Sequence, residues 1–177
     1  MNFHFLPLVL LLMNPIPIFD FQPSADLRKW TVVNDGVMGG RSQSTLRLDQ
    51  EGNGVFSGTV SLENNGGFAS IRLDCGHLSV TNSQSLILKV RGDGKRYQFR
   101  IRARKNEYYS YIHYFETSGD WEEISLPLSE FYPTFRGRKL DLPKFSGNAL
   151  EEIGILIGNK RQEDFRLLID FVGVRKE

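Results

Sequence analysis

The order of apolar and polar positions from residue 45 onward is that of short strands separated by glycine, asparagine and aspartate. No stretch keeps the 3.6-residue hydrophobic period of a helix. Residues 45–48 and 55–62 flank a polar, glycine-containing connection, which predicts a hairpin. Residues 64–67 predict the next turn and residues 68–73 the next strand. This pattern predicts an all-β fold, either a sandwich or a barrel.

The clearest alternation lies in residues 96–104, where apolar and polar side chains change places at every residue. Because successive side chains of a strand point to opposite faces, this segment predicts one buried and one cationic face. The apolar set is Tyr97, Phe99, Ile101 and Ala103, and the polar set is Arg96, Gln98, Arg100, Arg102 and Arg104.

The second half of the chain continues the strand pattern. Residues 86–90 form a nearly continuous apolar run, which predicts a strand buried on both faces, and residues 121–126 alternate. Residues 127–131 predict a helical turn at most, and residues 132–148, with their prolines and glycines, predict a long loop. Closing strands follow, the last with a period-two set of Phe165, Leu167, Ile169 and Phe171.

The amino-terminal segment stands apart from this pattern. Residues 5–13 form an apolar run that is shorter than the ~20 residues needed to cross a bilayer. We therefore divide the chain into residues 1–17, a candidate signal peptide or membrane tether through which the protein would associate with a membrane, and a single domain over residues 18–177.

Composition narrows the class of protein. The chain of 177 residues has 40% hydrophobic and 24% charged residues, the balance of a soluble globular domain. Lys and Arg number 22 against 21 Asp and Glu, so no global charge favours nucleic acid. The single cysteine, Cys75, is predicted to be a small core residue, and the three histidines lack ligand spacing. We therefore predict no metal and no cofactor.

Three segments carry candidate binding residues. The glycine-rich stretch at residues 34–42 lacks the Gly-Lys-Ser/Thr ending of a phosphate loop and precedes a strand, which favours a structural turn or a protein-contact loop. The arginine face could bind phosphate, carboxylate or an acidic protein surface, and the equal alternative is a solvated face paired with Asp and Glu of neighbouring strands. We predict that Arg100 and Arg102 belong to a partner surface.

The tyrosine-rich segment at residues 108–114 resembles the aromatic platforms on which sandwich modules stack sugar rings. Alternation sends Tyr109, Tyr111 and His113 to one face and Tyr108 and Tyr114 to the other, so only one set can be exposed. Tyr109 and Tyr111 are the candidate stacking residues, and packing within the sheet is the favoured alternative. No nucleophile with a base and no carboxylate pair is recognisable, because Glu122 and Glu123 should face opposite ways, and we predict no enzyme.

The segment Trp30-Thr31-Val32-Val33-Asn34-Asp35-Gly36-Val37-Met38-Gly39-Gly40-Arg41-Ser42 joins a tryptophan and a short apolar stretch to an acidic turn, a Met-Gly-Gly element and a serine. It resembles the opening motif of the complex I intermediate-associated protein 30 family, and the resemblance extends over residues 19–174. Further similar blocks are residues 66–70, 97–102, 115–117 with Trp121, 131–138, 153–157 and 165–174. The Met-Gly-Gly and Phe-Arg-Gly elements are the most specific of these.

The resemblance implies a galactose-binding-like jelly-roll β-sandwich of two antiparallel sheets. It also implies a non-catalytic, chaperone-like assembly factor that binds another protein, such as a respiratory-complex subunit. We assign the contact residues to two loops and the arginine face: Met38, Gly39, Gly40, Arg41, Arg100, Arg102, Phe135, Arg136 and Arg138. The alternative function is a carbohydrate-binding module.

The amino terminus also bears on location. Unlike mitochondrial members of the family, this chain shows no Arg- and Ser-rich transit segment. We therefore expect a bacterial protein that is exported to the periplasm or associated with a membrane, with a cytoplasmic location as the alternative and a mitochondrial one unsupported.

Overall fold

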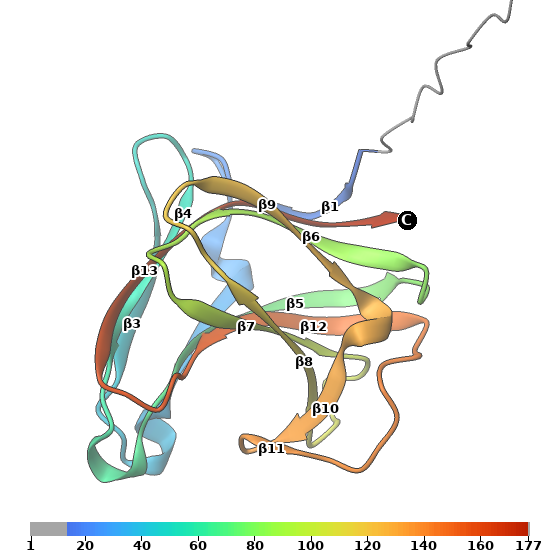
Figure 1. The fold of residues 1–177 in the computed structure, drawn as a ribbon. Helices are drawn as coiled ribbons and strands as arrows, with labels where there is room; N and C mark the ends of the chain where they lie inside the picture. Colours follow the sequence, from blue (N-terminus) through green and yellow to red (C-terminus); the bar gives the residue numbers. More distant parts are fainter. Residues whose placement is uncertain (1–13, 177) are drawn as a thin grey trace, which may run out of the picture.

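Two antiparallel sheets form the computed structural model of this chain, which describes residues 14–176 except for the side chains of Val37 and Met38 (Figure 1). Sheet A has the order β3-β4-β13-β6-β9, and β1 also pairs with β13. Its strands are β1 (Ile16–Asp20), β3 (Gln43–Leu48), β4 (Gly54–Val60), β6 (Gln84–Arg91), β9 (Trp121–Pro127) and β13 (Glu163–Lys176).

Sheet B has the order β11-β10-β8-β7-β12-β5-β2. Its strands are β2 (Trp30–Asn34), β5 (Ala69–Ser79), β7 (Arg96–Arg102), β8 (Ser110–Glu116), β10 (Tyr132–Phe135), β11 (Arg138–Lys139) and β12 (Ala149–Ile157). The short 3-10 turns are η1 (Leu27–Lys29), η2 (Asp35–Met38), η3 (Glu63–Asn65) and η4 (Leu128–Glu130). The predicted jelly-roll β-sandwich is confirmed.

The core lies between the two sheets and is filled by alternate residues of their strands. In β7 the side chains of Tyr97, Phe99 and Ile101 are almost fully buried, while the arginines point away from the core, as the alternation predicts. Leu86 and Ile87, which are successive residues of β6, are both fully buried. Both faces of the strand are therefore covered at these residues, as predicted, whereas Lys89 of the same run is exposed.

The period-two prediction fails at one residue of the last strand. Phe165, Leu167 and Ile169 are buried, but Phe171 is only half-buried. The register of β13 shifts between Ile169 and Phe171 against β6, and a bulge of this kind inserts one extra residue and exchanges the two faces. Val172 and Val174 consequently take the core positions instead.

The predicted long loop over residues 132–148 is also wrong in its first part. Tyr132–Phe135 adds to β8 as strand β10, and Arg138–Lys139 pairs back on it as β11. The two residues between them, Arg136 and Gly137, have φ values of 48° and 76°. Two successive positive φ values build the tight hairpin turn that matches the twist of the flanking strands.

The described residues contain no helix that is both long enough and apolar enough to cross a membrane. Residues 1–13 of the candidate signal peptide or tether lie outside the described part of the chain, and Ile16 already pairs with Val174 in sheet A.

The environment of Cys75 predicts a thiol that reacts slowly. Burial raises its pKa to about 12, and the side chain packs against the core. Since only the thiolate reacts with iodoacetamide, alkylation at pH 8 should be slower by at least ~100-fold in the native protein than in denaturant. Native labelling at the denatured rate would contradict this account of Cys75.

Candidate partner-binding surface

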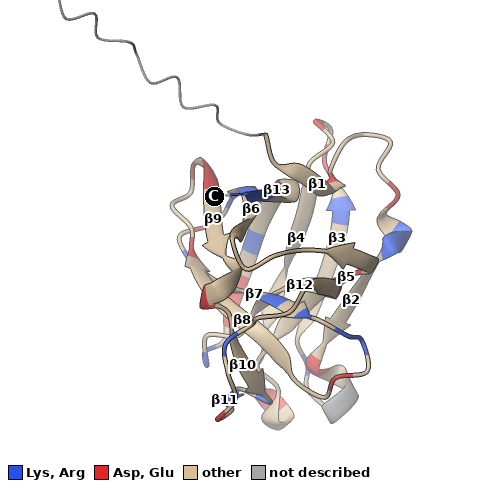
Figure 2. Ribbon diagram, turned by 90° about the vertical axis from the view of Figure 1, so that its right-hand side faces the viewer, with Lys and Arg blue, Asp and Glu red and all other residues tan. Residues whose placement is uncertain are grey.

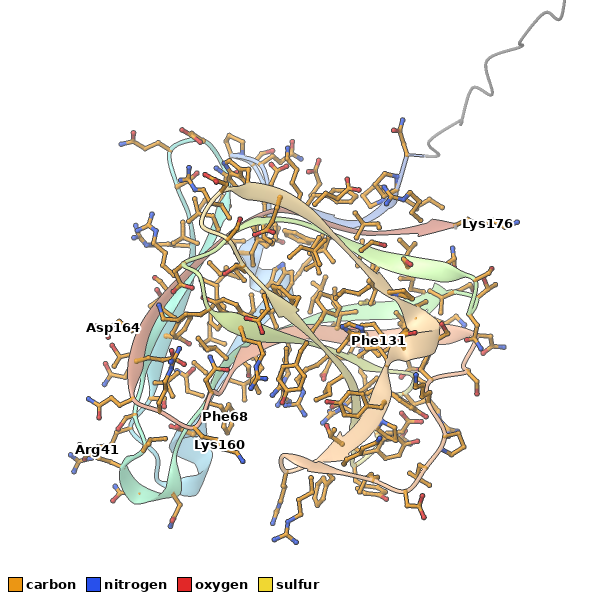
Figure 3. The ribbon with its side chains drawn as sticks, in the orientation of Figure 1. Arg41, Phe68, Phe131, Lys160, Asp164 and Lys176 are labelled. Atoms are coloured by element: carbon orange, nitrogen blue, oxygen red, sulfur yellow. The ribbon has the colours of Figure 1, made fainter. Side chains whose placement is uncertain are left out.

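The outer face of sheet B, which points away from the core, lies between two loop regions. The region of η2 and η3 and the β10–β11 hairpin lie at the same end of the molecule and on opposite sides of this face in both views (Figures 1 and 2). Arg41, Phe68 and Lys160 mark the first of these regions (Figure 3). We call the two regions the glycine rim (residues 39–41 and 66–68) and the hairpin rim (residues 135–138).

The glycine rim is held together by one buried carboxylate. Asp35 is 1% exposed and accepts hydrogen bonds from the backbone N–H and the hydroxyl of Ser42, at 3.0 and 2.5 Å. Its Oδ2 also accepts from the backbone N–H groups of Gly67, at 2.6 Å, and Phe68, at 3.2 Å. A single side chain thus joins two segments that lie 32 residues apart in the sequence.

Two glycines of the rim are needed because they pack directly on this carboxylate. A Cβ atom at Gly40 would lie 2.3 Å from Oδ1 of Asp35, and one at Gly66 would lie 2.6 Å from Oδ2. Neither position can therefore carry a side chain without displacing Asp35. The Met-Gly-Gly element is a structural turn at Gly40, whatever else it contacts.

Hydrogen bonding decides the charge state of Asp35. Burial by itself would raise the pKa of this carboxyl, but the donors on Ser42, Gly67 and Phe68 outweigh burial and lower the pKa below its ordinary value. The group is consequently an anion at neutral pH.

The exposed part of the glycine rim is small. Gly39 is exposed and has a φ of 85°. Arg41 is also exposed and forms an ion pair with Glu63 at 2.8 Å. The side chain of Met38 lies outside the described residues.

The hairpin rim presents an aromatic pair with basic neighbours. Tyr108 is 61% exposed and Phe135 is 36% exposed, and their ring centroids lie 5.3 Å apart, edge to face. The guanidinium of Arg136 lies 5.2 Å from the centroid of the Phe135 ring. Arg138 is exposed on β11. The chain therefore exposes aromatic surface at the tip of a turn that requires positive φ.

The arginines of β7 alternate with its buried residues, so their side chains lie on the outer face of sheet B. Arg102 forms an ion pair with Glu152 at 3.4 Å, and its Nε donates to the hydroxyl of Ser110 at 3.1 Å. Arg96 lies over the ring of Tyr114, 4.5 Å from its centroid. Arg100 has neither an ion pair nor a side-chain hydrogen bond to any residue that the structure describes. The alternative prediction, in which these arginines pair with acidic residues of neighbouring strands, thus holds for Arg102 but not for Arg100.

The candidate stacking residues pack at the edge of the core. The rings of Tyr109 and Tyr111 lie 5.4 Å apart, and Tyr111 also contacts Phe145 edge to face at 5.3 Å. Burial, followed by a hydrogen bond with Tyr109, raises the pKa of Tyr111. Tyr114 lies on the opposite face of β8, as the alternation predicts. Among residues 14–176 no group of three or more His, Cys, Asp or Glu side chains is arranged to hold a metal ion.

Three residues of this surface were not singled out from the sequence: Asp35, Arg72 and Glu152. Asp35 could have been suspected because it stands in the middle of a glycine-rich turn, where its carboxylate can accept from nearby backbone donors. Arg72 and Glu152 become neighbours of Arg100 and Arg102 only through strand pairing. A single sequence does not specify that pairing.

Comparison with known proteins identifies the family of this chain. The sequence model of the family described as Complex I intermediate-associated protein 30 (CIA30) matches residues 19–169. The chain belongs to this family. It is 31% identical over 180 residues to "Complex I intermediate-associated protein 30, mitochondrial" of Mus musculus, covering 89% of this chain and 55% of the mouse protein. The Drosophila melanogaster protein of the same name is 30% identical, with coverage of 89% and 62%.

These CIA30 relatives differ from the chain in extent, because it spans only about half to two thirds of their length. Their names refer to association with complex I intermediates and describe no catalysed reaction. The relatives are named as mitochondrial proteins. The expectation that this chain is an exported bacterial protein, with a mitochondrial location unsupported, is therefore wrong. That expectation rested on the first residues alone, whereas the family match begins at residue 19.

Solved structures of similar fold are carbohydrate-binding modules and parts of glycoside hydrolases. The family 11 carbohydrate-binding module of a cellulosomal cellulase of Clostridium thermocellum aligns with a TM-score of 0.65, 12% identity and coverage of 89% and 92%. The glycoside hydrolase domain of Endo-D from Streptococcus pneumoniae aligns with a TM-score of 0.52, also at 12% identity, over 84% of this chain and 21% of that one. At this identity the likeness concerns the fold alone.

The role of Asp35 in the glycine rim can be tested by Asp35→Asn. The amide would place an NH₂ group among N–H donors, and we expect the free energy of unfolding at pH 7 to fall by about 2–4 kcal/mol in urea denaturation. Because the pKa of Asp35 is lower in the folded than in the unfolded protein, its charge stabilises the fold fully at pH values above the unfolded pKa of ~3.9. This stabilisation is lost as the pH falls through the folded pKa.

The variant should therefore lose stability less steeply than wild type below about pH 4, by up to ~1.4 kcal/mol per pH unit. Glu63→Gln, which removes an exposed ion pair from the same rim, is the control and should cost at most ~1 kcal/mol. Equal unfolding free energies for wild type and Asp35→Asn at pH 7 would show that the carboxylate does not hold the rim.

Proposed function

We propose that this CIA30 domain is a non-catalytic assembly factor that binds a subunit of respiratory complex I while that subunit is incompletely assembled. The names of its relatives support the choice of complex I. The observation that carries the proposal is the hairpin rim, where an exposed aromatic pair stands beside Arg136 and Arg138. Aromatic residues and arginine are the side chains most enriched at the energetic centres of protein interfaces.

The backbone of the hairpin rim supports the same proposal. A left-handed conformation costs a residue with a side chain roughly 1–2 kcal/mol, and Arg136 adopts it at φ 48°. Asparagine or glycine would occupy this position at less cost. A side chain that contacts a partner would account for an arginine at this strained position.

The contact surface we propose runs from the hairpin rim across the outer face of sheet B to the glycine rim. Arg100 and Arg102 lie on the strand between the rims, and Gly39 and Arg41 stand at the far side. Gly40 shapes the turn that carries them, and Met38 precedes it in η2. A chaperone-like action would consist of covering apolar surface of the subunit until its neighbours arrive.

A carbohydrate-binding function is the alternative prediction. No contact of Tyr109 or Tyr111 favours it, because the two rings pack on each other and Tyr111 also packs on Phe145. The fold likeness to carbohydrate-binding modules does not supply a ligand.

The proposal is tested by capturing the tagged, full-length protein from its own cells after mild crosslinking. We expect complex I subunits to be recovered with the wild type and to fall by at least ~10-fold with Phe135→Asp/Arg136→Glu, because loss of one interface centre costs ~2 kcal/mol or more. Quantitative mass spectrometry is the readout, and thermal unfolding of both proteins checks that the fold is kept.

The matched control is Ile16→Asp/Arg47→Glu, which makes the same kinds of change at exposed positions of sheet A. It should capture the same subunits as wild type. Retention on a polysaccharide matrix without capture of any subunit would replace the assembly role by the carbohydrate-binding one.

A further inference from the structure

A small pocket opens on the outer face of sheet B, between the two rims, and two arginines line it. Its volume is about 10 Å³, close to the ~10–15 Å³ that admits one water-sized group. Arg72 and Arg100 belong to the lining, together with Ser110, Glu152 and Gly154. The pocket can therefore admit a single polar atom of a partner.

Strand register explains why a pocket exists at this point. Gly154 of β12 is paired with Arg72 of β5 on one side and with Arg100 of β7 on the other. Because neighbouring strands lie ~4.8 Å apart, the backbones of the two arginines are about 10 Å from each other. The strand position between them, Gly154, carries no side chain. A Cβ at Gly154 would lie 2.7 Å from the carbonyl oxygen of Ile71 and 3.4 Å from Cγ of Arg72. A glycine inside a strand commonly marks such a close approach of a ligand.

The charges around the pocket do not balance. The neighbouring register row pairs Glu152 with Arg102, and these two side chains form the ion pair already described. Arg72 and Arg100 are half-buried and have no ion pair or side-chain hydrogen bond within residues 14–176. Burial and the nearby charges of Arg72 and Arg102 lower the pKa of Arg100 to about 10, so it stays a cation at neutral pH.

A neutral donor completes the lining. The hydroxyl oxygen of Ser110 accepts from Nε of Arg102 at 3.1 Å, while its own hydrogen has no acceptor among the side chains and backbone that the structure describes. Two guanidinium groups and one hydroxyl therefore offer donors to the same space. Glu152 supplies the one carboxylate among the lining residues, and its Oε1 forms the ion pair with Arg102.

We propose that this pocket binds the carboxylate of an aspartate or glutamate side chain on the partner protein, between the guanidinium groups of Arg72 and Arg100. One carboxylate oxygen that enters the pocket can accept charge-assisted hydrogen bonds from both guanidinium groups. A monoanion suits the site better than a phosphate dianion, because the carboxylate of Glu152 lies in the same lining and repels a second negative charge. The inference rests on the proposed function, since it names the group by which the subunit is held.

The binding chemistry can be measured without the partner. The probe is a blocked Gly-Glu-Gly peptide added to the full-length protein labelled with ¹⁵N arginine, and the readout is the set of Nε–Hε NMR signals. We expect saturable shifts for Arg72 and Arg100, no saturable shift with blocked Gly-Gln-Gly, and at least ~10-fold weaker binding in Arg72→Gln or Arg100→Gln. Arg47→Gln makes the same charge change on β3 of sheet A and should leave binding unaltered.

Stability separates a binding role from a structural one. Because Arg100 has no partner in the free protein, Arg100→Gln should leave the melting temperature within about 2 °C of wild type or raise it. A fall of more than ~5 °C would mean that Arg100 supports the fold and would overturn the proposal. Tighter saturation of the same signals by inorganic phosphate than by the glutamate peptide would also overturn it, in favour of a phosphate ligand.

Capture from cells distinguishes failure of the carboxylate-binding pocket from failure of the assembly role. If Arg72→Gln/Arg100→Gln still captures complex I subunits as wild type does, the pocket is not the holding point, although the assembly role stands. If the pocket binds the glutamate peptide and no complex I subunit is captured by wild type, the carboxylate does not come from such a subunit and the assembly role fails. Loss of both peptide binding and subunit capture in the double variant is the result that supports the proposal.

Discussion

The buried carboxylate of Asp35 is the interaction on which one side of the proposed surface depends. Four hydrogen bonds from Ser42, Gly67 and Phe68 converge on it, and they join the start of η2 to Ser42 and to the two residues before β5. An uncompensated buried charge would be unstable, but here every donor around it is supplied by the two segments that it holds. Gly40 and Gly66 must be glycines because the carboxylate fills the space where their side chains would stand.

The hairpin rim and the outer face of sheet B differ from the Asp35 site, where every donor comes from the chain itself. The hairpin rim places an arginine in a strained conformation beside exposed aromatic rings, and the outer face of sheet B keeps Arg72 and Arg100 half-buried without an ion pair. Both are expected of groups whose partner belongs to another molecule, and they stand on a sheet whose inner face is tightly packed.

Sequence patterns predicted the elements whose signal is local. Alternation in residues 96–104 placed Tyr97 and Phe99 in the core and the arginines outside. The hairpin of β10 and β11 was missed, because the prolines and glycines of residues 132–148 predicted a loop. The bulge near Asp170 could not be predicted, because it arises from pairing between β13 and β6, which moved Phe171 off the core face. The pairing of Arg72, Gly154 and Arg100 likewise depends on three strands that are distant in the sequence.

The central claim is that the outer face of sheet B meets a complex I subunit. Site-specific photo-crosslinking in the cell tests it most directly, with a benzophenone amino acid at Tyr114 on that face, and at Arg47 on sheet A for comparison. We predict that position 114 forms an adduct with a complex I subunit and that position 47 forms none. The adduct should map to a segment of the subunit that contains Asp or Glu. Adducts with that subunit from position 47 alone, or no complex I adduct from position 114, would contradict the central claim.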